Sequence, residues 1–250
     1  MTRWQKIGLA ALIIVLGITV LIAMGFRAKT DMRNLLYPLA PPMPAVVSKP
    51  MPEILARLDA VLKTNAPSVF AELQPGLSAN AIAGLEKQYH VQIPDDIKAI
   101  YEWHDGSAST TNRLSDDFIP IHRFPPLEES LANKAMEWKG ATAAQRAVAG
   151  ALTSYRDSWI CLFDDGAGNG YWYDPQRKPS EGAIFCQFTE DASFVFFPSA
   201  KNLMAGIAKC YESGAFRIKP GSTPPDLDED FQLATKIWTE FGASNLPPTN

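Results

Sequence analysis

Hydrophobic residues in the first part of the globular region recur at the three- and four-residue spacing of amphipathic helices. One such stripe covers residues 54–62, and a second begins near Ser78, whose hydroxyl is suited to cap a helix N-terminus. A third helix begins at Pro94, and we expect Gly106 to end it as a C-cap residue. Three helices therefore open the globular region.

The hydrophobic pattern changes to that of β-strands from residue 118 onward. Short apolar runs bounded by turn residues predict a single strand and then two hairpins. In order, the expected elements are a strand over 118–121, a helix over 126–138, strands over 159–163 and 170–173 joined by the turn 164–169, and strands over 183–188 and 194–197. Residues 140–151 fit none of these patterns.

The last part of the chain returns to helical spacing. A helix capped by Ser199 ends at Gly214, a linker rich in Pro, Gly and Ser covers 219–225, and a final helix follows. Helices, an antiparallel meander and helices again predict an α+β fold, a mostly antiparallel sheet with helices packed around it.

A long apolar run near the N-terminus predicts a transmembrane helix. Residues 7–26 carry no charge, and about 20 residues at 1.5 Å rise match a hydrocarbon core roughly 30 Å thick. A cleaved secretory signal is the alternative, but such segments are shorter and end in a small-x-small site, which residues 23–25 match poorly. We expect a single-pass anchor in a bacterial inner membrane. The flanking Lys and Arg nearly balance, so the positive-inside rule does not decide the topology. We expect a short N-terminal tail inside and the domain on the outer, periplasmic side.

Prolines dominate the segment after the apolar run and favour an extended polyproline-II spacer. The expected organisation is an anchor with its flanks over 1–27, a Pro-rich linker over 28–52, an α+β domain over 53–215, and a linker with a C-terminal helix over 216–250.

The charge of the chain is distributed unevenly. Residues 1–33 carry five Lys or Arg and one Asp, a net +4, so the total of −4 leaves −8 for residues 34–250. An acidic domain repels phosphate backbones, which argues against nucleic-acid binding and for basic partners, although solubility alone explains the same charge. Of the three cysteines, Cys161 and Cys186 fall in predicted strands. The sequence does not decide whether a disulfide joins them.

No catalytic, metal or cofactor motif is visible in the sequence. The glycines at 166, 168 and 170 precede a strand instead of a helix, which favours a hairpin turn over a phosphate loop. Asp164, Asp165 and Asn169 lack the spacing of an EF-hand, and the three histidines lack metal-ligand spacing. We therefore expect no enzyme, no cofactor and no small-molecule substrate.

Two stretches together resemble the SUKH superfamily. The first, residues 85–106, reads LEKQYHVQIPDDIKAIYEWHDG, and the second, residues 163–174, reads FDDGAGNGYWYD. The resemblance spans roughly residues 54–211. The superfamily includes fungal cell-wall synthesis regulators and bacterial immunity proteins against polymorphic toxins. The resemblance implies a mostly antiparallel sheet with helices packed around it, and a binding module without catalysis.

The resemblance and the composition of the two motifs suggest where a partner binds. Aromatic residues with acids nearby are typical interface anchors, and the candidates are Trp103, Asp105, Asp164, Asp165, Asn169 and Trp172. Along the strand at 171–173, either Tyr171 and Tyr173 or Trp172 would form the buried set. We expect an immunity-type inhibitor that occludes a protein partner, such as a basic toxin. The alternative is a membrane-anchored cell-envelope regulator or scaffold.

Overall fold

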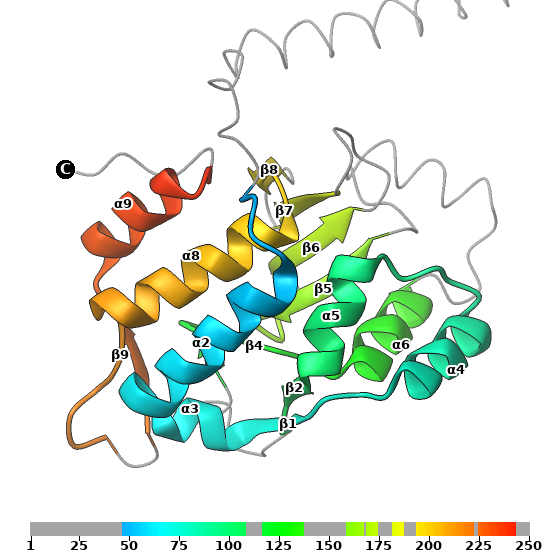
Figure 1. Cartoon of the computed structure of the whole chain (residues 1–250), viewed down its shortest axis with the longest axis horizontal. Coiled ribbons are helices and arrows are strands. Elements are labelled where there is room, and N and C mark those ends of the chain that lie inside the picture. The colour runs from blue at the N-terminus through cyan, green and yellow to red at the C-terminus, as the bar shows by residue number, and fades with distance from the viewer. Residues whose placement is uncertain are drawn as a thin grey trace, which may run out of the picture. The chain divides into compact units, whose positions relative to one another are not determined.

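A six-stranded antiparallel sheet is the largest sheet in the part of the chain that the structure describes (Figure 1). The structure is a computed structural model, and it describes residues 47–108, 117–137, 159–167, 169–174, 182–187, 194–222 and 225–243. In pairing order the strands are β3 (Asp117–Ile119), β4 (His122–Arg123), β5 (Ile160–Asp164), β6 (Gly170–Asp174), β7 (Ala183–Gln187) and β8 (Phe194–Phe197). Two smaller antiparallel pairs join β1 (Leu73–Pro75) to β2 (His104–Ser107) and β9 (Phe216–Ile218) to β10 (Leu227–Glu229).

Helices surround this sheet, which confirms the predicted α+β class. They are α2 (Met51–Asn65), α3 (Pro67–Glu72), α4 (Ala79–Tyr89), α5 (Asp95–Trp103), α6 (Leu127–Glu137), α8 (Ala200–Ser213) and α9 (Phe231–Glu240). In Figure 1, α8 crosses the sheet with α2 on one side and α9 on the other, while α4, α5 and α6 form a separate group.

Local capping sets several helix ends where the sequence predicts them. The Ser78 hydroxyl accepts a hydrogen bond from the amide of Ala81 at the start of α4, at 3.2 Å. Ser199 caps α8 in the same way, and Gly214 ends this helix with a φ of +74°, which glycine adopts without steric cost. These three expectations are confirmed.

One continuous hydrophobic core lies between the helices and one face of the sheet. Its largest fully buried side chains include Tyr101 of α5, Phe163 of β5 and Tyr211 of α8. Ile237 and Trp238 of α9 belong to the same core, so the C-terminal helix packs against the domain. The buried side chain of Asn202 joins both ends of the domain to α8. It accepts a hydrogen bond from the amide of Val47 (3.1 Å) and donates one to the carbonyl of Phe241 (3.0 Å).

Two expectations for individual elements are wrong, and one strand pair was not anticipated. The helix that starts after Pro94 ends at Trp103, and Gly106 lies inside β2, where a side chain at this position would collide with the backbone of residues 124–126. The expected strand 118–121 is two strands joined by a tight turn. The expected linker 219–225 is flanked by β9 and β10, which pair with each other.

The two strand cysteines are too far apart for a disulfide. Cys161 lies opposite Trp172 of β6, and Cys186 opposite Tyr171, so β6 separates β5 from β7. Two inter-strand spacings amount to about 9–10 Å, beyond the reach of a disulfide. Neither cysteine is in a disulfide, and both are buried, as is Cys210. Burial raises the pKa of Cys186 to about 12.

The predicted anchor at residues 7–26 and the linker up to residue 46 lie outside the described residues. By internal contacts the chain divides into Met1–Pro42 and Met43–Asn250, and every described residue belongs to the second unit. No helix within the described ranges is long and apolar enough to cross a membrane.

Candidate partner-binding site

Two tight turns lie at the same end of the six-stranded sheet. One joins β3 to β4 through Pro120 and Ile121, and the other joins β5 to β6 over residues 165–169. Because β4 runs antiparallel to β5 and Arg123 lies opposite Asp164, both turns project from the same end. We call this region the turn end.

The turn between β5 and β6 is held by the carboxylate of Asp165. This carboxylate accepts hydrogen bonds from the amides of Ala167 (2.8 Å) and Asn169 (2.9 Å), and from the side-chain amide of Asn169 (2.5 Å). Burial would raise the pKa of Asp165, but these hydrogen bonds outweigh it and lower the pKa below its usual value. The predicted candidates Asp165 and Asn169 therefore form one ordered, negatively charged turn.

Asp164 links this turn to α6 through an arginine. Arg123 donates to both carboxylate oxygens of Asp164, at 3.0 and 3.1 Å, and to Glu129 of α6 at 2.5 Å. Asp164 also accepts a hydrogen bond from the amide of Gly166 (2.9 Å). The bidentate geometry fixes the guanidinium between two carboxylates. The two negative charges of Asp164 and Glu129 therefore outweigh the single positive charge of Arg123.

Ile121 is the exposed residue of the other turn. Its side chain is 71% exposed and its φ is +62°, a conformation that a β-branched residue rarely adopts. The carboxylate of Asp117 accepts a hydrogen bond from its amide at 3.2 Å, which supports the turn. The neighbouring His122 is buried against Tyr171, and burial lowers its pKa, so the ring is neutral at pH 7. Among the described residues, the turn end thus carries Asp117, Glu129, Asp164 and Asp165 against one cation, Arg123.

The sequence did not point to Ile121, Arg123 or Glu129 as site residues. One signal was available: Pro120 interrupts the apolar run, and a proline inside a strand-like run favours a turn or an edge. No local sequence pattern predicts a positive φ at an isoleucine.

Asp105 positions a helix. Its carboxylate accepts a hydrogen bond from the amide of Leu127 at 2.9 Å, so it caps the N-terminus of α6 from a distant part of the chain. Burial raises the pKa of Asp105, and the Leu127 amide offsets this only in part. Because α6 carries Glu129, Asp105 supports the Arg123 contact indirectly.

Trp103 packs at the end of α5, inside the domain. Its indole donates to Asp59 of α2 at 3.4 Å, and its ring contacts His104 and Phe118 edge-on. The side chain is half-buried. The structure therefore places Trp103 between α2 and the core.

Trp172 lies on the second face of the sheet and is only 6% exposed. It forms a small hydrophobic cluster with Trp159, Cys161, Ala183 and Phe185, apart from the main core. Tyr171 and Tyr173 pack on the main core. Tyr173 and Trp172 are thus buried and Tyr171 is partly buried. Neither alternative anticipated this, because the sheet is apolar on both faces. In this structure Trp172 has little surface to offer a partner.

Two of the three histidines have ring nitrogens that face protein oxygens. Both ring nitrogens of His104 face oxygens, the carbonyl of Gln74 at 2.7 Å and the carboxylate of Asp59 at 3.4 Å. Nδ1 of His122 faces the carbonyl of Pro120 at 3.0 Å. In the described ranges no group of three or more His, Cys, Asp or Glu is placed to hold a metal ion.

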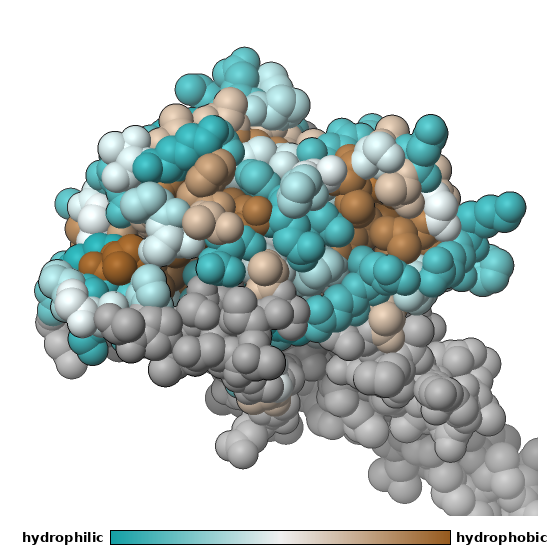
Figure 2. Space-filling model, turned by 90° about the horizontal axis from the view of Figure 1, so that it is seen from below, coloured by the Kyte–Doolittle hydropathy of each residue, from teal (hydrophilic) through white to brown (hydrophobic). Residues whose placement is uncertain are grey.

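The surface seen in Figure 2 is mostly hydrophilic, and its hydrophobic residues form separate patches. This side of the domain offers no continuous apolar face. A partner approaching it would meet charged groups and small apolar spots.

The comparisons identify the family once both motifs are placed in the fold. The sequence profile of the SMI1 / KNR4 family (SUKH-1) matches residues 76–206, slightly more than half of the chain. The chain belongs to this family. The SUKH-1 match covers α4 to the middle of α8 and includes both motifs that carry the resemblance. A search among curated proteins finds no match.

Membership in SUKH-1 is compatible with a non-catalytic domain of immunity type or one related to the cell wall. It specifies no partner. The six candidate site residues all fall within the matched range, but nothing tests their role in binding, and this role stays a prediction.

Proposed function

We propose that this domain is a non-catalytic immunity-type inhibitor that covers the surface of a toxin with its turn end. The observation that carries the proposal is the combination of an exposed, strained Ile121 with the carboxylates of Asp117, Asp164 and Asp165 at the same end of the sheet. Apolar anchors supply most of the affinity of an interface, while charges speed encounter and set specificity. The partner is therefore a protein with an apolar socket bordered by Lys or Arg.

The electrostatics support a basic partner. Residues 34–250 carry a net charge of −8, and hydrogen bonding keeps Asp165 ionised at neutral pH. The carboxylates are fixed by backbone amides and by Arg123, so little order has to be gained on binding. A fixed acidic surface favours fast association that slows as salt rises.

The histidine contacts support a role without chemistry. A general base must reach a substrate proton through a ring nitrogen, and both nitrogens of His104 already face protein oxygens. The family assignment is compatible with the same conclusion.

Co-expression with a toxin encoded beside the gene tests the proposal, with cell survival as the readout. Ile121→Asn removes the anchor, and Ala167→Lys adds a positive charge to an exposed position of the acidic turn without touching its hydrogen-bonded carboxylate. Both should reduce protection. The matched control is Phe231→Asn, because Phe231 is the other large hydrophobic side chain exposed in the described part of the chain, at 52%. Full protection by both turn-end variants would contradict the proposal.

A cell-envelope regulator is the second candidate. The predicted anchor at residues 7–26 and the Pro-rich linker favour it, since they would hold the domain near a bacterial inner membrane. A short N-terminal tail inside would place the domain on the outer side. The turn end would then bind an envelope protein. Retention of the full-length protein in membranes through alkaline washing, with no protection against any neighbouring toxin, would favour this candidate.

A further inference from the structure

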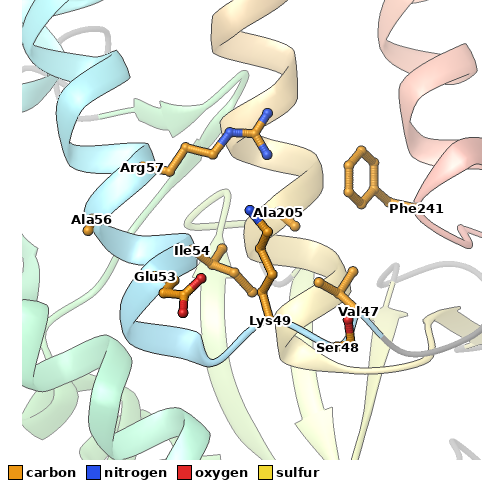
Figure 3. Close-up of a pocket in the computed structure, with 9 residues that line it drawn as sticks. All are labelled: Val47, Ser48, Lys49, Glu53, Ile54, Ala56, Arg57, Ala205 and Phe241. Carbon is orange, nitrogen blue, oxygen red and sulfur yellow. The ribbon is translucent and has the colours of Figure 1, made fainter.

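A groove of about 560 Å³ lies where α2, α8 and the end of α9 meet (Figure 3). It is separate from the turn end. Its lining residues are Val47, Ser48, Lys49, Glu53, Ile54, Ala56, Arg57, Ala205 and Phe241. All of them except Ala205 fall outside residues 76–206, so segments beyond the SUKH-1 match build the groove.

The groove combines an apolar floor with two cations. Ile54 and Ala205 are each 3% exposed and form the floor, and Phe241 faces them from the end of α9. In Figure 3 the ammonium of Lys49 and the guanidinium of Arg57 both project toward α8, and Glu53 lies beside Ile54 on α2. Because Glu212 of α8 pairs with Arg57, the ammonium of Lys49 is the main positive charge above this apolar surface.

Both cations retain donors for a ligand. The Nε and Nη2 atoms of Arg57 donate to Glu212 of α8, which orients the guanidinium and leaves Nη1. Among the described residues, no carboxylate forms an ion pair with Lys49. Lys49 therefore supplies most of the positive charge that a ligand carboxylate would meet. At physiological salt, charges beyond about 8 Å are largely screened, so the acidic surface elsewhere on the domain weakens this attraction little.

Asn202 fixes two walls of the groove. Its side chain binds the amide of Val47 on one side and the carbonyl of Phe241 on the other, and it is only 1% exposed. The entry to α2 and the exit of α9 are thus tied to the same buried residue. A groove fixed in this way loses little freedom when a ligand enters.

We propose that this groove binds an acidic peptide segment of a protein partner. An apolar side chain would lie over Ile54, Ala205 and Phe241, while Lys49 and Arg57 would hold the adjacent carboxylate. Charge complementarity supports this occupant, because a guanidinium and an ammonium side by side suit a carboxylate. The volume lies within the range of roughly 300–1,000 Å³ that is usual for ligand sites. The proposal does not depend on the turn end.

The test uses full-length protein with labelled Ile and Val methyl groups and two capped peptides, acetyl-Leu-Glu-Leu-amide and acetyl-Leu-Gln-Leu-amide. The Glu peptide should shift the methyl signals of Ile54 and Val47. It should bind more tightly than the Gln peptide by about fivefold, the upper end for a solvent-exposed ion pair. Lys49→Met should remove this difference.

Two further variants complete the design. Lys87→Met is the matched control, because Lys87 is an exposed lysine of α4 outside the groove, and it should leave the preference unchanged. Ala56→Trp should block binding of both peptides, since Ala56 is exposed and lines the groove. Equal affinity for the two peptides, unshifted Ile54 and Val47 methyls, or an unchanged preference in Lys49→Met would each overturn the proposal.

Discussion

Replacing Ile121 by Asn should make the domain more stable while it weakens partner binding. Ile121 occupies the left-handed region at a φ of +62°, where the Cβ of an L-residue is crowded by the backbone. Asn tolerates this region because its short polar side chain hydrogen-bonds locally. The bond from the residue 121 amide to Asp117 is a backbone contact and survives the change.

The expected gain follows from two opposing quantities. Relief of the left-handed conformation returns roughly 1–2 kcal/mol. Ile121 is 71% exposed, so less than a third of its side chain is buried. Full burial of an isoleucine contributes about 1.5–3 kcal/mol, and the part lost here is therefore at most about 0.5–0.9 kcal/mol. The net gain is about 0.5–1 kcal/mol.

Urea unfolding followed by tryptophan fluorescence measures this gain. The midpoint should rise at an unchanged slope, and Tm should rise by about 1–4 °C for a domain of this size. Ile121→Val is the control, because it keeps β-branching and the strain. A lower midpoint for Ile121→Asn would refute the reasoning, since it would mean that Ile121 makes stabilising contacts or is not strained.

Three other changes probe the scaffold behind the turn end. Gly106→Ala should lower the free energy of unfolding in urea by about 3 kcal/mol, because the added Cβ would lie 2.4 Å from the Pro126 nitrogen at a φ of +76°. Gly84→Ala on α4 is the control. A Cβ there has nothing within 4 Å, so this change should raise the free energy of unfolding by up to about 1 kcal/mol. Asp105→Ala should lower the free energy of unfolding by about 1 kcal/mol, because α6 loses its cap. Asp105→Asn keeps an oxygen acceptor and should retain most of that stability. Equal loss in both variants would contradict the capping role. Burial lowers the pKa of His122 below its ordinary value of 6.5, so the unfolded chain takes up a proton first and stability falls as pH drops below about 6.5. His122→Gln should flatten this part of the pH profile, and an unchanged slope would exclude His122 as its source.

The sequence predicts elements well where local chemistry decides them. Ser78 and Ser199 supply hydroxyl caps, Gly214 supplies a left-handed C-cap, and the glycine-rich turn separates two apolar strands. Each of these signals lies within a few residues of its effect. The β9–β10 pair was missed because its strands are only three residues long and show no clean alternation, so pairing depends on contacts across the turn.

The candidate site was predicted in part, and for a clear reason. Asp164, Asp165 and Asn169 lie in one turn because they are adjacent in sequence. Asp105 reads as an exposed acid, yet it caps a helix that begins 22 residues later, and only the fold brings the two together. Trp172 reads as an exposed anchor because strand alternation predicts one buried face, whereas this sheet buries both.

The stoichiometry of inhibition tests the central claim most directly. A purified toxin encoded beside the gene is titrated with the full-length protein, and residual toxin activity is measured at each ratio. Occlusion without catalysis predicts that activity falls linearly to an end point at one protein per toxin and returns when the complex is dissociated. Complete loss of activity at a small fraction of one equivalent, or loss that persists after the protein is removed, would contradict the account.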